Sequence, residues 1–400
     1  MRFDCSSICG AILGSTSLRT LVLDENRIRS LPDSLFLLLN TLWTLKLRDN
    51  EITDVYSNSF TGLVGLRELD LSGNKIPMLP LGIFDPLGLL STLSVANNEI
   101  RHVDQIPFQS CRDLLTLDMS NNLLPSINAD WFVTTTRLTS LKLSQNRIED
   151  IQAGSFDQLR QLEELDLSEN YLSSFRNNTF ANCQSLQKLN LARNPIRELA
   201  SPGTTFVGLT ALRELDLRGS CITMLVLNSS APLPALAELY LGENLLTEIG
   251  RHSLAAATSL RKLDLADNNI EDIEAGALSS LTSLDSLDLS RNFLTEDQLV
   301  DVLQTVPSDI VVDVSWNRLK SIASLTPIGG IYLSGNPLVC SCTPPSWISL
   351  ADSSRLLDET QTLCYSGSEP FYLLCYWSRC GPSTDHQLCL LYTSPSPRDS

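Results

Sequence analysis

The sequence predicts an α/β solenoid in which about 14 repeats share one parallel β-sheet, and two periodicities carry this prediction. Asparagine recurs every 24 residues in seven consecutive steps from Asn26 to Asn194, and it resumes from Asn244 to Asn336, with Ser220 in the one missing position. Phenylalanine keeps the same step from Phe36 to Phe180. Two registers that are kept over this distance indicate stacked structural repeats.

Each repeat has a short strand followed by a turn, as in LEELDLSENYLSSF, residues 162–175. Leu165 and Leu167 alternate with polar residues, so the strand buries one face. Asn170 follows where the chain leaves the strand, and its amide can both donate to and accept from turn backbone groups that stacking buries. The leucines of one repeat are buried by its neighbours, so the strands must stack in parallel.

These residues resemble the extracellular leucine-rich repeat family of the typical 24-residue class, with the pattern LxxLxLxxNxIxxIxxxxFxxL. The resemblance covers about residues 18–338. It implies a horseshoe with the sheet on its concave side, as in Toll-like receptor ectodomains and in secreted or adhesion proteins of this class.

Two segments depart from the repeat. The step from Asn194 to Ser220 is 26 residues long and contains the insertion ASPGTTF, and loops on a rigid scaffold often carry function. Residues 295–306, TEDQLVDVLQTV, predict a short helix whose leucines and valines face inward.

Near the C-terminal end, Cys340 and Cys342 lie within the motif NPLVCSC. Their spacing alone is compatible with three roles: metal ligands, a redox pair or halves of two different disulfides. C-x-C is a less usual zinc spacing than C-x-x-C. The segment also resembles the C-terminal cysteine-rich cap of secreted leucine-rich repeat proteins, here residues 336–388 with Trp347. That resemblance implies a Cys340–Cys364 disulfide and a second one from Cys342 to Cys380, with Cys375 as a competing partner.

Disulfides favour an oxidising, extracellular compartment, and the N-glycosylation sequons at Asn177 and Asn228 agree with it. Cys111 and Cys183 replace leucine in the repeat and lie three repeats apart, too far for a disulfide, so we expect buried free thiols. Cys221 is expected to be unpaired as well.

The two ends of the chain differ from the repeats. Residues 1–17, with Cys5 and Cys9, resemble a remnant of the family's N-terminal cap, which suggests that the natural start lies upstream. Residues 389–400, CLLYTSPSPRDS, resemble a translated sequencing adapter. We therefore expect this tail to be non-native and leave Cys389 out of the disulfide count.

Composition and motifs argue against several function classes. The chain has 29 Lys+Arg against 46 Asp+Glu, a net charge of −17, which disfavours nucleic acid and, more weakly, an anionic membrane. No apolar run reaches the length of a membrane span. The three histidines are isolated, and no P-loop, GxSxG or HExxH motif occurs, so we expect no enzyme, no cofactor and no metal site.

The exposed face of the predicted sheet is the candidate binding surface. Between the two strand leucines, seven of the fourteen repeats carry aspartate, and the last position of this row is Tyr332. The aspartates are either a solvated consensus or an acidic face for a basic ligand, and Trp316 could bind the ligand or cover the end of the sheet. Aromatic residues beside charges are typical interface anchors. The predicted ligand site comprises Asp216, Tyr240, Asp264, Asp288, Asp313 and Trp316.

The resemblance implies a ligand-binding ectodomain that recognises a protein or peptide, with a Toll-like innate immune or developmental receptor as the first hypothesis. Two copies could pair on ligand binding. A secreted matrix or adhesion protein is the alternative, and a fragment of a peroxidasin-like enzyme is a third.

Overall fold

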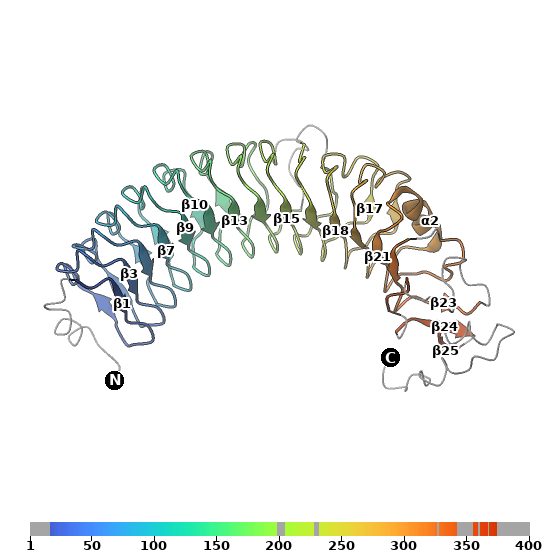
Figure 1. Ribbon diagram of the computed structural model, residues 1–400, viewed down its shortest axis with the longest axis horizontal. Coiled ribbons are helices and arrows are strands. Elements are labelled where there is room, and N and C mark those ends of the chain that lie inside the picture. Colours follow the sequence, from blue (N-terminus) through green and yellow to red (C-terminus); the bar gives the residue numbers. More distant parts are fainter. Residues whose placement is uncertain are drawn as a thin grey trace. The chain divides into compact units, whose positions relative to one another are not determined.

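The structure is a computed structural model that describes residues 17–197, 205–227, 232–325, 328–341, 355–358, 361–366 and 368–373. The chain divides into two compact units, Met1–Leu215 and Asp216–Ser400. Fourteen three-residue strands form one sheet in chain order, β1-β3-β5-β7-β9-β11-β13-β14-β15-β16-β18-β20-β21-β22. The predicted solenoid with a parallel sheet is confirmed (Figure 1).

Unit 1 contains the first eight long strands, and β15 (Glu214–Asp216) crosses the boundary after Leu215. The long strands are β1 (Thr20–Val22), β3 (Thr44–Lys46), β5 (Glu68–Asp70), β7 (Thr92–Ser94), β9 (Thr116–Asp118), β11 (Ser140–Lys142), β13 (Glu164–Asp166) and β14 (Lys188–Asn190). Opposed residues are 24 apart, as in Leu45 and Leu69, because each repeat adds one full turn. Short strands pair on the returning half: β2 (Ser30–Leu31) with β4 (Asp54–Val55), β6 (Met78–Leu79) with β8 (His102–Val103), and β10 (Ser126–Ile127) with β12 (Asp150–Ile151).

Unit 2 continues the same pattern with β16 (Glu238–Tyr240), β18 (Lys262–Asp264), β20 (Ser286–Asp288), β21 (Val311–Asp313) and β22 (Gly330–Tyr332). On its returning half, β17 (Glu248–Ile249) pairs with β19 (Asp272–Ile273). The predicted helix is α2 (Glu296–Thr305), which buries Leu299, Val302 and Leu303. The side chain of Gln298 accepts the N–H of Thr295 at 3.3 Å, which caps the first turn.

Two ladders of side chains fill the core of unit 1. The phenylalanine rings from Phe36 to Phe180 stack with centroids 5.9–6.4 Å apart. Cys111 and Cys183 are buried free thiols, as predicted, and burial raises the pKa of each to about 12. Cys221 is also free, and it is exposed.

The asparagines form the second ladder. Asn146 donates to the carbonyls of Met119, Leu143 and Ser144, and its Oδ1 accepts the N–H of Leu124 at 3.1 Å. The residue before it, Gln145, has φ 55°, and residues at this position of the other repeats are left-handed too. The predicted role of asparagine in satisfying turn backbone groups is therefore confirmed, both within a turn and between turns.

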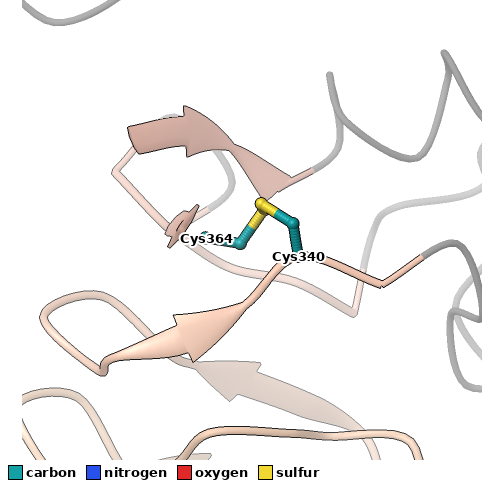
Figure 2. Close-up of a disulfide and its surroundings, with 2 residues drawn as sticks. All are labelled: Cys340 and Cys364. Atoms are coloured by element: carbon teal, nitrogen blue, oxygen red, sulfur yellow. A yellow bond between two sulfur atoms is a disulfide. The ribbon is translucent and has the colours of Figure 1, made fainter. Parts of the chain in front are cut away.

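The C-terminal cap holds β23 (Leu338–Val339), β24 (Leu363–Ser366) and β25 (Glu369–Tyr372). A disulfide joins Cys340 to Cys364, with Cα atoms 4.9 Å apart (Figure 2). Asp358 accepts the N–H groups of Leu333 at 2.9 Å and of Ser334 at 2.5 Å, which a further repeat would otherwise satisfy.

Several sequence predictions fall outside the described residues. These are the second cap disulfide, the N-terminal cysteines, one sequon and the C-terminal tail: Cys342, Cys375, Cys380, Cys5, Cys9, Asn228 and residues 389–400.

Candidate functional site

The strand register of unit 2 brings the predicted acidic residues into one row on the outward face of the sheet. Tyr240 lies opposite Asp264, which lies opposite Asp288. The row continues to Asp313 and ends at Tyr332. We call Asp264, Asp288 and Asp313 the acidic row. Adjacent strands are about 4.8 Å apart, so these carboxylates act on one another.

The aspartates also have a structural role in the turn after each strand. Each carboxylate accepts the N–H of the residue two positions later. In the acidic row the acceptors and donors are Asp264 and Ala266 at 3.0 Å, Asp288 and Ser290 at 2.9 Å, and Asp313 and Ser315 at 2.8 Å. Asp118 makes the same bond in unit 1. This bond explains why aspartate recurs, and each carboxylate keeps further lone pairs for a ligand.

Burial raises the pKa values of Asp264 and Asp313, because water cannot fully solvate the charged carboxylates. The neighbouring Asp288 raises both further, and Asp358 adds to the effect at Asp313. Arg218 and Lys262 act in the opposite direction at Asp264. A cation brought against the C-terminal part of the row would therefore be stabilised.

Tyr240 is already enclosed by side chains of its own sheet. The guanidinium of Arg218 and the ammonium of Lys262 each lie 4.9 Å from its ring centroid. Its hydroxyl donates to Glu238 at 2.5 Å. These contacts fix the ring and reduce the area that a ligand could cover.

Asp216 holds Arg218 in place over the Tyr240 ring. Its side chain is 9% exposed and accepts Arg218 through both oxygens, with Nε at 3.0 and 3.1 Å. Asp216 therefore orients the cation that covers Tyr240, and little of its carboxylate faces solvent.

Trp316 and Tyr332 are the accessible aromatic residues at the other end of the row, 57% and 36% exposed. Trp316 has φ 57° and packs on Gly335, where an added Cβ would lie 2.4 Å from the indole ring. Arg291 lies 5.5 Å from the ring centroid. Trp316 thus covers a turn at the end of the sheet and still presents most of its surface, so the two interpretations are compatible. Tyr332 lies in the predicted row, but the predicted ligand site did not include it.

Metal binding has no support in the described ranges, where no group of three or more His, Cys, Asp or Glu residues is placed to hold an ion. Within the same part of the chain, no helix has the length and apolar character needed to cross a membrane.

The comparisons with known proteins agree with the fold. The family model described as leucine rich repeat matches residues 16–76, 89–148, 136–196 and 234–294, more than half of the chain. The chain therefore belongs to the leucine-rich repeat family, whose solenoids are typically scaffolds for protein interaction. No curated protein matches it.

Solved structures of other repeat proteins are similar in fold. A leucine-rich repeat protein of Leptospira interrogans is 26% identical, with 74% of this chain and 71% of that chain covered and a TM-score of 0.62. The mouse RP105/MD-1 complex gives 22% identity, 92% and 58% coverage and a TM-score of 0.67. The TLR13–ssRNA13 complex is 24% identical, with 93% of this chain and 58% of that chain covered and a TM-score of 0.65. The chain thus spans 58% of the length of the last two proteins.

Proposed function

We propose that this chain is the ligand-binding ectodomain of an extracellular receptor of the Toll-like kind, and that it binds a protein or peptide with a basic patch. The observation that carries the proposal is the acidic row of unit 2, which ends beside the exposed side chains of Trp316 and Tyr332. We call these five residues the C-terminal sheet face.

Rigid strands hold this surface before a ligand arrives, so little conformational entropy is lost on binding. Lysine or arginine side chains of the ligand would relieve the repulsion within the acidic row. Trp316 and Tyr332 would supply apolar contact, because aromatic residues dominate interface energetics. The net charge of −17 argues against a nucleic acid ligand for this chain.

The receptor assignment rests on the fold and on the cap. The similarity to RP105 and TLR13 extends over 92% and 93% of this chain. The Cys340–Cys364 disulfide fits a compartment that permits disulfides.

A selection of phage-displayed peptides on the 400-residue chain tests the site. We expect peptides rich in Lys and Arg with an apolar residue. Asp288→Lys with Asp313→Lys should slow their association about tenfold, with a smaller salt dependence. Trp316→Ala should weaken binding about 30-fold, the equivalent of about 2 kcal/mol, through faster dissociation.

The matched control is Asp118→Lys with Asp166→Lys. These residues hold the same strand position and make the same bond to a serine N–H two residues on, but they lie outside the acidic row. Equal binding by the wild-type chain and the Asp288, Asp313 and Trp316 variants would place the site elsewhere.

A further inference from the structure

A second surface lies on one flank of unit 1 and is apolar. Leu37, Leu38, Val64 and Leu89 are 52%, 55%, 57% and 45% exposed. They follow the stacked rings of Phe36, Phe60 and Phe84, whose centroids are 6.4 and 6.2 Å apart, so they belong to three successive turns. Exposed apolar groups on successive turns mark interaction sites more often than single exposed leucines do.

The backbone of this flank is closely stacked and smooth. Gly62 has φ +99°, and a Cβ there would lie 2.5 Å from the backbone of Leu37 in the preceding turn. Gly65 and Gly88 also carry no side chain between the exposed residues. A partner could therefore approach the backbone closely and contact the exposed side chains of Leu38 and Val64.

A cationic border lies where the flank meets the sheet. Trp43 is 45% exposed, and the guanidinium carbons of Arg19 and Arg67 lie 4.4 and 5.5 Å from the Trp43 ring centroid. Among the described residues, neither arginine has a carboxylate within 4.0 Å. Both guanidinium groups are thus held in place with donors available for an incoming carboxylate.

The apolar flank has a boundary along the solenoid. One and two repeats after Leu89, the same position is occupied by Asp113 and Arg137, which form an ion pair at 2.6 Å. These exposed aliphatic side chains, Arg19 and Arg67 therefore all belong to the first three turns of the described chain.

We propose that this surface, the unit 1 flank, binds a protein segment that presents aliphatic or aromatic side chains beside carboxylates. Leu37, Leu38, Val64 and Leu89 would contact the apolar side chains. Arg19 and Arg67 would bind the carboxylates, and Trp43 would keep both guanidinium groups aligned. Charge complementarity selects an acidic segment here, whereas the C-terminal sheet face selects a basic one.

A protein segment fits better than a lipid surface, because the chain as a whole is acidic and would be repelled by anionic headgroups. A second copy would have to bring an acidic apolar segment against the flank, and this possibility is an outcome of the test.

The experiment selects phage-displayed peptides on the 400-residue chain and elutes them with an excess of the Asp288→Lys, Asp313→Lys variant. This variant has an altered acidic row but an intact unit 1 flank, so it competes for ligands of the flank and releases them. We expect peptides that combine Leu, Phe or Trp with Asp or Glu. Leu38→Ser with Val64→Ser, and separately Arg19→Glu with Arg67→Glu, should each weaken their binding at least tenfold. The arginine variant should lose more affinity at low salt than at high salt.

Two matched variants serve as controls and should bind within about twofold of the wild-type chain. Val133→Ser removes a residue that is 49% exposed at the repeat position of Leu37, on the same turn as Arg137 and outside the first three turns. Arg160→Glu reverses an exposed arginine outside the flank. Circular dichroism should show unchanged thermal unfolding in every variant, because all altered side chains are on the surface.

Three results would overturn the proposal. The first is that no acidic apolar peptides are selected, or that they bind the flank variants as well as the wild type. The second is sedimentation with vesicles of phosphatidylcholine and phosphatidylserine that the flank variants abolish. The third is a wild-type dimer in analytical ultracentrifugation that those variants convert to monomer. Since both variant pairs lie in unit 1, failure here leaves the proposed function of the C-terminal sheet face untouched.

Discussion

The asparagine ladder makes a quantitative prediction at Asn146, which is 6% exposed. Asn146→Ala removes the three hydrogen bonds that its Nδ2 donates to carbonyls, at 3.0, 3.1 and 3.2 Å. It also removes the acceptor of the Leu124 N–H, which is buried. A net hydrogen bond contributes about 1 kcal/mol, and an orphaned buried donor costs about 1–3 kcal/mol. The two N–H groups of Nδ2 make these three contacts, so they count as about two hydrogen bonds, and with the orphaned donor we expect the free energy of unfolding to fall by about 3–5 kcal/mol.

Equilibrium urea unfolding followed by far-ultraviolet circular dichroism measures this loss. Asn58→Ala is the matched control, since Asn58 is exposed in the same unit, and it should change the free energy by less than about 0.5 kcal/mol. If Asn146→Ala unfolds with the same free energy as Asn58→Ala, the asparagine ladder does not stabilise the solenoid. The ordered turns would then be held by leucine and phenylalanine packing alone.

Three further predictions concern the cysteines and the acidic row. Cys364→Ser should lower the free energy of unfolding by about 2–5 kcal/mol. Peptide mapping of the wild-type chain without reductant should recover Cys340 joined to Cys364. Iodoacetamide at pH 8 should alkylate exposed Cys221 and spare Cys183, whose pKa is about 12, and equal labelling by mass spectrometry would contradict this. Burial raises the pKa of Asp264 in the folded state, so ionisation there opposes folding, and Asp264→Asn should raise the thermal midpoint at pH 7. This advantage should shrink as the pH falls through the raised pKa toward 3.8 and be absent below it, and an advantage that persists in acid would refute the assignment.

The architecture could be predicted in detail because the same sequence pattern recurs in every repeat. Each asparagine in the sequence indicates a turn, and the constant spacing sets the register that places Leu45 opposite Leu69. The replacement of leucine by Cys111 sufficed to predict a buried thiol. Division into two units at Leu215 could not be predicted from this pattern, since the strand motif continues across it.

The candidate site was less accessible to sequence reasoning, and Tyr240 shows the physical reason. The repeat places Tyr240 and Tyr332 in equivalent positions of the row, but their availability depends on side chains one turn away. Arg218 and Lys262 cover the faces of Tyr240, whereas Tyr332 lies next to Asp313 at the end of the sheet. The period of 24 residues fixes the position of a residue on the sheet. The length and charge of the side chains on the adjacent strands determine how much of its surface a ligand can contact. Anchor residues on such a surface are therefore better sought where a neighbouring turn carries a small residue, as Gly335 does beside Trp316, than where the row itself is most aromatic or most acidic.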